Sequence, residues 1–159
     1  QMRLDELGPE PKVGVVCPLA NGSEAETRAL EQLACVAGVR LVLMHPRPDE
    51  RFMQELLARH SHLHVPENLP KKSNLDGRAA LLSVLDLLIA PAGVTAHLAG
   101  ALGTPTCAVV PRKASWRWMQ DGCTTPWYPR TRIFRETHDR NRDQVIQDLC
   151  AKLRQWIAE

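Results

Sequence analysis

The 159-residue sequence has few aromatic residues, little net charge and no long apolar run. Aromatic residues make up 4% of it, as four Trp, two Phe and one Tyr. The formal net charge of +2 gives no argument for a nucleic-acid or membrane-surface partner. No stretch is long and apolar enough for a membrane span, and no signal peptide is visible. The length suits one domain with its own core.

Cysteine pairs and metal-ligand clusters are also missing. The five cysteines are odd in number, widely spaced and without a C-x-x-C pair, and Cys17 and Cys107 fall in apolar runs. This pattern argues against a disulfide framework and favours a reducing compartment, so we expect a cytoplasmic protein. His60, His62 and His64 alternate, but no carboxylate or cysteine nearby would complete a metal site, so we predict no metal. The sequence also lacks G-x-S-x-G, Walker A and G-x-G-x-x-G motifs, which removes support for a hydrolase, an NTPase or a simple dinucleotide-binding protein.

Strand and helix patterns alternate along the chain. Short, continuous apolar runs, each followed by a helical pattern, indicate a parallel sheet covered on both faces. We therefore predict an α/β fold: a Rossmann-like parallel sheet of about six strands with helices on both faces, over residues 12–159. Residues 1–11 are expected to be a charged linker or lead-in. The predicted strands are 12–18, 39–46, 62–66, 86–91, 104–111 and 131–136, and the predicted helices are 20–38, 49–60, 77–85, 93–102 and 141–159.

Several predicted helix ends carry specific signals. Ser23 with Glu26 forms a capping box for the first helix, and Gly38 is expected to end it. Asp76 is expected to cap the third helix, and Gly103 to end the fourth. In such sheets ligands bind over the carboxyl ends of the strands. The loops after the first, second, fourth and fifth strands are therefore the expected rim of a site.

The run LLIAPAGVTAHLAGALGTP joins the fourth strand to the fourth helix. The first turn of this helix has unpaired N–H groups at the positive end of the helix dipole, which suits a phosphate. Gly93 allows close approach to the backbone, and Thr95 adds a hydroxyl. Small residues here are also typical of tight helix–sheet packing. His97, expected on the inward side of the helix with Val94, Leu98 and Ala101, is more typical of a hydrogen-bonded packing residue than of a catalyst.

A basic, Trp-containing stretch, PRKASWRW, follows the fifth strand. Arg112, Lys113 and Arg117 bring three cations to the expected rim, which suits a diphosphate. Trp116 suits stacking on a base or a sugar. The other interpretation is a solvated basic loop whose Trp residues cover the edge of the sheet. The remaining aromatic residues nearby are expected to fix the loop: Trp118, Trp127 and Tyr128.

The chain from about Asp86 to Arg135 resembles the C-terminal half of the heptosyltransferase-like glycosyltransferases. AHLAGALG, WRW and PWYP occur in order, as in the branch associated with tetratricopeptide repeats. The resemblance implies one half of a GT-B fold: the donor-binding domain of a metal-independent inverting glycosyltransferase that uses a nucleotide-diphosphate sugar and no cofactor. An N-terminal acceptor domain, with the general base and with tetratricopeptide repeats as an expected companion, would precede it. The chain would then be a fragment of a longer protein and inactive alone.

The resemblance also assigns roles to residues. The backbone from Gly93 to Thr95 would hold the diphosphate, with cationic side chains beside it, and His97 would support the turn. Ala92 departs from the pattern, because the family has Asp there, and the first loop has no basic residue before Arg28. The alternative function is therefore a degenerate GT-B domain with a scaffold or protein-interaction role. A third candidate function is that of an unrelated nucleotide-binding module, which is less consistent with the three motifs occurring in order. The implied donor-binding residues are Gly93, Val94, Thr95, His97, Arg112, Lys113, Trp116 and Arg117.

Overall fold

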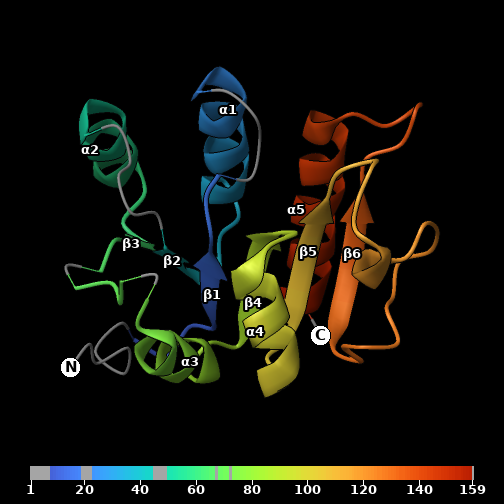
Figure 1. Cartoon of the computed structure of the whole chain (residues 1–159). Coiled ribbons are helices and arrows are strands. Elements are labelled where there is room, and N and C mark those ends of the chain that lie inside the picture. The colour runs from blue at the N-terminus through green and yellow to red at the C-terminus, as the bar shows by residue number, and fades with distance from the viewer. Residues whose placement is uncertain (1–7, 19–22, 45–49, 67, 72, 159) are drawn as a thin grey trace.

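A six-stranded parallel sheet forms the centre of the protein, in the order β3-β2-β1-β4-β5-β6 (Figure 1). The computed structural model describes residues 8–18, 23–44, 50–66, 68–71 and 73–158. The strands are β1 (Lys12–Val15), β2 (Arg40–Leu43), β3 (Leu63–His64), β4 (Leu87–Pro91), β5 (Thr106–Val110) and β6 (Thr131–Arg135). The helices are α1 (Ser23–Ala34), α2 (Glu50–Arg59), α3 (Leu75–Ser83), α4 (Val94–Leu102) and α5 (Arg142–Ala158), with a short 3-10 helix, η2 (Trp116–Trp118).

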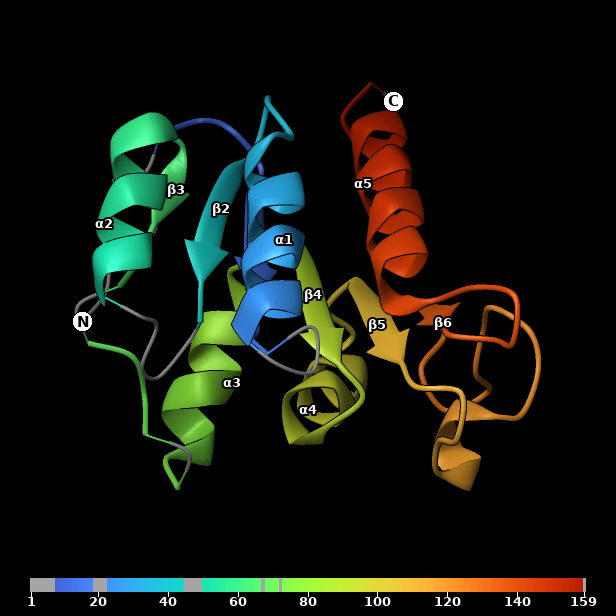
Figure 2. The same ribbon diagram turned by 90° about the horizontal axis from the view of Figure 1, so that it is seen from above.

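Helices cover both faces of the sheet. α1, α2 and α5 pack on one face, and α3 and α4 pack on the other (Figure 2). Each face buries its own apolar cluster, one including Leu33 and Leu149 and the other including Leu82 and Trp118. Burial on both faces explains why the strands read as continuous apolar runs rather than alternating ones. The predicted α/β Rossmann-like fold of six parallel strands is confirmed.

The direction in which strands are added reverses at β1, which pairs with β2 on one side and with β4 on the other. In sheets with this order, ligands bind outside the carboxyl ends of the strands at such a switch point. The ends of β1 and β4 therefore mark the centre of the expected rim. Of the rim loops, residues 19–22 and 45–49 lie outside the described residues.

Asn74, not Asp76, caps α3. The Asn74 side-chain oxygen accepts a hydrogen bond of 2.9 Å from the backbone N–H of Gly77. The helix starts at Leu75, two residues before the predicted start, so Asp76 lies in its first turn, where its charge favours the positive end of the helix dipole. The prediction of Asp76 as the cap is wrong. Asn74 and Asp76 are both residue types that cap helices, and the sequence pattern does not show which of the two precedes the first helical residue.

Other helix ends agree with the sequence in part. Gly103 ends α4 in the left-handed conformation, with φ of 75°, as predicted. Gly38 also has a positive φ, 85°, but α1 already ends at Ala34. The side chain of Ser23, on which the predicted capping box depends, lies outside the described residues.

Residues 8–11 of the predicted lead-in contain no helix or strand. They lie against β2, where the backbone N–H of Arg40 donates to the carbonyl of Pro11 at 2.8 Å and its guanidinium lies 3.5 Å from the Glu10 carboxylate. All five cysteines are free thiols. In the described part of the chain, no helix combines the length and apolar character needed to cross a membrane.

Candidate functional site

The first turn of α4 lies directly after the carboxyl end of β4. The backbone N–H of Ala92 donates to the carbonyl of Val109 at 2.9 Å, and Gly93 is already the N-cap of the helix. Gly93 has no side chain to cap the N–H groups that every helix leaves unpaired in its first turn. Val94, the first helical residue, is 67% exposed. The positive end of the α4 dipole therefore faces the rim of the sheet.

Arg78 of α3, which the sequence pattern did not single out, also reaches this turn. Its guanidinium donates a hydrogen bond to the hydroxyl oxygen of Thr95, a residue that is only 7% exposed. A guanidinium beside the positive end of a helix dipole is electrostatically unfavourable unless an anion is also present. One feature of the sequence could have pointed to Arg78: it lies in the first turn of the helix after β3. Helices in this fold begin at the edge of the sheet where β4 ends, so a basic residue in that turn lies near the start of α4.

The buried side of α4 differs from the predicted one. The helix buries Thr95, Ala96 and Ala99, whereas Val94 and Ala101 are exposed. The prediction that Val94 and Ala101 face inward is wrong. Because nearly all residues of this helix are small or apolar, the spacing of apolar residues does not single out one face.

His97 connects α4 to a cluster of aromatic rings. Its Nδ1 lies 2.9 Å from the Tyr128 hydroxyl, and its ring stacks on Trp118 with 4.8 Å between centroids. Gly100 completes the contact, because a Cβ there would lie 2.4 Å from Cγ of Tyr128. AHLAGALG, WRW and PWYP thus supply one packing unit, and Trp118, at 2% exposure, and Tyr128 form the scaffold predicted for them.

The environment of His97 favours the neutral form of its ring. Burial lowers its pKa below the usual 6.5, and the positive charge of Arg117 lowers it further. A neutral imidazole adds no positive charge to an anion site. What it provides is a fixed connection between α4 and the aromatic cluster.

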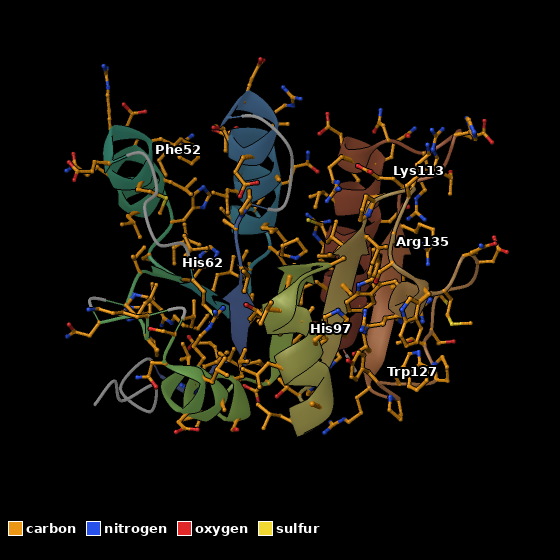
Figure 3. All side chains as sticks on the ribbon, in the orientation of Figure 1. Phe52, His62, His97, Lys113, Trp127 and Arg135 are labelled. Carbon is orange, nitrogen blue, oxygen red and sulfur yellow. The ribbon has the colours of Figure 1, made fainter. Side chains whose placement is uncertain are left out.

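The basic residues after β5 point in different directions. Arg112 faces the segment after β6, where its Nη1 lies 3.0 and 3.1 Å from the two ring nitrogens of His138. Lys113 lies beyond the carboxyl ends of β5 and β6 (Figure 3). Arg112 and Lys113 are both exposed, so each is accessible to a ligand from solvent.

Trp116 and Arg117 belong to a different surface. Trp116 is 63% exposed and contacts Trp127 edge to face, with 5.3 Å between centroids, while the Arg117 guanidinium lies 4.6 Å from the centroid of the Trp116 ring. Trp127 comes shortly before the first residue of β6 and lies at the opposite end of that strand from Lys113 (Figure 3). The structure therefore gathers the residues from Gly93 to His97 with Arg78, and it places Trp116 toward the other end of the sheet.

The three alternating histidines lie at the start of β3. The rings of His60 and His62 are edge to face at 5.7 Å. Burial, with the charges of His60 and Arg40, lowers the pKa of His62, and the hydrogen bond that its ring makes to the Ala34 backbone acts in the opposite direction. Among the described residues, no group of three or more His, Cys, Asp or Glu side chains could hold a metal ion.

Comparison with known proteins places the chain in a family. Residues 23–153 match glycosyltransferase family 9 (heptosyltransferase), and the chain belongs to this family. The protein FlbA of Caulobacter vibrioides is 32% identical over 142 residues, which are 83% of this chain and 23% of FlbA. The E. coli heptosyltransferase WaaC shares the fold: its structure with ADP-2-deoxy-2-fluoro heptose gives a TM-score of 0.52 at 20% identity, over 94% of this chain and 43% of WaaC. The structure of WaaC with ADP gives a TM-score of 0.49 at 21% identity over the same shares.

Proposed function

We propose that this chain is the donor-binding half of a metal-independent inverting glycosyltransferase that uses a nucleotide-diphosphate sugar. Family membership supports glycosyl transfer, and the WaaC structures contain ADP and an ADP-heptose analogue. The chain spans 43% of WaaC and 23% of FlbA, which supports an assignment to part of a larger enzyme. The order of the motifs AHLAGALG, WRW and PWYP supports its assignment to the C-terminal half of that enzyme. An N-terminal acceptor domain with the general base, and tetratricopeptide repeats, would lie outside the chain in a cytoplasmic protein.

The placement of Arg78 against the first turn of α4 is the observation that carries this proposal. Two positive features, the Arg78 guanidinium and the end of the helix dipole, meet at Thr95. A diphosphate bound there accepts hydrogen bonds from the backbone of Val94 and Thr95 and neutralises both features. Because a leaving diphosphate gains negative charge in the transition state, donors already in place stabilise it without a metal ion.

The remaining predicted residues divide by their position. His97 positions α4 through Tyr128 and Trp118, and Lys113 adds a cation at the same edge of the sheet. Among the described residues, Arg117 has no contact with the proposed donor turn in this arrangement; its charge adds to burial, the larger cause, in lowering the pKa of His97. Arg112 and Trp116 contact other groups and are left out of the proposed donor site.

Calorimetric titration with a panel of nucleotide-diphosphate sugars tests the proposal. At least one member of the panel is expected to bind, and Arg78→Gln to weaken it roughly tenfold to a hundredfold, since hydrogen bonds to charged groups contribute about 1.5–3 kcal/mol. Arg51→Gln is the matched control, because it removes the same charge from a side chain on α2 that is 90% exposed. Absence of binding across the panel by the folded protein overturns the proposal, and sugar transfer by this chain alone overturns its assignment to one half of the enzyme.

A degenerate domain with a scaffold or protein-interaction role is the second candidate. Ala92 stands where the family resemblance places an Asp. At the end of β1, burial raises the pKa of the Cys17 thiol, and the charge and hydrogen bond of the Glu26 carboxylate raise it further. The Glu26 carboxylate is therefore an acidic group close to the switch point, where it opposes phosphate binding. The end of β1 thus favours the second candidate.

A further inference from the structure

A concave feature lies at the same edge of the sheet as the first turn of α4, on the side of β6. It is an open depression of about 540 Å³, lined by Arg112 and by residues from the segments 120–123 and 133–140. Its charged lining residues are Arg112, Arg135, Arg140, Asp121 and Glu136. The residues from Gly93 to His97 are not part of this lining, so the depression is distinct from the first turn of α4.

Ion pairs at the margin of the depression offset part of its charge. Glu136 pairs with Arg142, whose Nε lies 2.6 Å from the carboxylate. Arg140 pairs with Asp148 of α5. The charges left facing the depression are the two guanidinium groups of Arg112 and Arg135 and the carboxylate of Asp121. The balance is positive and favours an anionic ligand.

Arg135 presents an unused hydrogen-bond donor. It is the last residue of β6 (Figure 3), in register with Val110, and its Nη2 donates to the carbonyl of Trp118. Its Nε is buried and has no hydrogen-bond partner among the described residues. A buried N–H without an acceptor is costly and rare in native proteins, and rotation of the Arg135 guanidinium toward an oxyanion in the depression would supply the acceptor.

We propose that this depression is an oxyanion site in which Arg112 and Arg135 bind a carboxylate or phosphate group of the glycosyl acceptor. The assignment to the acceptor rests on the proposed function. Arginine matches the geometry of both groups, because its planar guanidinium offers paired donors. Asp121 disfavours a second negative charge in the depression, so one oxyanion group is expected.

The position of the depression suits an acceptor group next to the donor. The ends of β4 and β6 are two strand spacings apart, about 10 Å. Trp118 connects the two sites directly, since its ring stacks on His97 of α4 while its carbonyl accepts from Arg135. A donor on α4 and an acidic group in the depression therefore fit side by side at one edge of the sheet.

Titration of the isotope-labelled chain, followed by NMR, tests this site. With ADP present in excess to occupy the α4 turn, inorganic phosphate is expected to shift the Arg135 Nε–H signal and the backbone signals of Gly122 and Thr137 in a saturable manner. Acetate in a parallel titration separates the two sources of the oxyanion: the stronger ligand of the pair identifies the acceptor group as a phosphate or a carboxylate. If neither ligand saturates these signals, the site is refuted.

Substitutions connect the signals to the residues. Arg112→Gln is expected to weaken phosphate or acetate binding about tenfold, while Arg51→Gln, which removes the same charge elsewhere, changes it less than twofold. Arg135→Lys keeps the charge but removes the Nε donor, and is expected to weaken binding as much as Arg112→Gln does. If Arg135→Lys does not fold, the exposed Arg112 decides the test alone. Unchanged affinity in Arg112→Gln overturns the site.

The ADP titration separates this proposal from the donor proposal. If ADP displaces phosphate from Arg135, the depression belongs to the donor site and its assignment to the acceptor is overturned. If ADP leaves the signals of Val94 and Thr95 unchanged while phosphate still saturates Arg135, the oxyanion site stands. The donor proposal, and with it the assignment to a glycosyl acceptor, then fails.

Discussion

Gly100→Ala tests the packing unit that holds α4 in place. In the interior of an exposed helix this substitution stabilises a protein by about 1 kcal/mol. In α4 the new Cβ would lie 2.4 Å from Cγ and 2.5 Å from Cδ1 of Tyr128. Real Cβ atoms do not make such contacts, so either the helix or the Tyr128 ring must move. The ring is also held at its hydroxyl by His97.

The expected cost follows from these contacts. Overpacking costs about 1–3 kcal/mol, and loss of the hydrogen bond between His97 and Tyr128 adds about 1 kcal/mol. The gain in helix propensity offsets about 1 kcal/mol of this. Gly100→Ala is therefore expected to lower the free energy of unfolding by about 1–3 kcal/mol, which for a domain of this size lowers Tm by roughly 2–12 °C.

A double-mutant cycle separates the clash from other effects. Urea and thermal unfolding would be measured for Gly100→Ala, Tyr128→Ala and the double variant. Without the ring, the new methyl group has room, and Gly100→Ala is expected to stabilise the protein by up to about 1 kcal/mol. The effect of one substitution thus changes sign with the background. Equal destabilisation in both backgrounds, or stabilisation of the otherwise unmodified chain, would refute the packing unit.

Three further predictions concern the turn, its histidine and the thiols. Ala92→Asp adds a negative charge that opposes both diphosphate ligands alike, so its effect is expected as a relative gain: about fivefold, the value of one hydrogen bond to the sugar, for the nucleotide sugar over the free nucleoside diphosphate; an equal change for both ligands in calorimetry contradicts this. The pKa of His97 is lowered in the folded state, so as the pH falls below 6.5 the unfolded chain takes up a proton first and the folded protein loses stability. Urea unfolding at pH 7.5 and at pH 5 should show a smaller loss of stability for His97→Gln than for the unmodified chain. An equal loss in the two proteins counts against this prediction. The exposed Cys35 and Cys123 are expected to react first with a thiol reagent at pH 8, before the other three thiols, whose pKa values are raised by burial; five equally fast thiols would exclude the fold described.

The sequence predicted the fold well because its strands are buried on both faces. Continuous apolar runs separated by helical segments leave few arrangements other than a parallel sheet, and α4 begins within one residue of its predicted start. The start of α3 was harder to predict. Two capping residue types precede it, and the sequence pattern alone does not choose between Asn74 and Asp76.

The site could be predicted only as far as local sequence determines it. The turn at Gly93 is a local feature, because β4, the turn and α4 follow one another directly along the chain. Arg78 contacts Thr95 because α3 packs against α4, a tertiary contact that no spacing along the sequence encodes. The same holds for Arg112, which follows β5 as expected but faces His138. Arg135 falls within the predicted strand 131–136, yet its role depends on a carbonyl in η2.

The most direct measurement is residue-level mapping of nucleoside diphosphate binding on this chain. Backbone and arginine side-chain NMR signals would be followed as ADP, UDP, GDP and CDP are added, in the unmodified chain and in Arg78→Gln. A diphosphate at the start of α4 is expected to shift the backbone N–H signals of Val94 and Thr95 and the Nε–H signal of Arg78, and Arg78→Gln to reduce the affinity at least tenfold. Saturable binding that leaves the signals of the α4 turn unchanged, or an affinity that does not depend on Arg78, would contradict the assignment of this turn as the donor site.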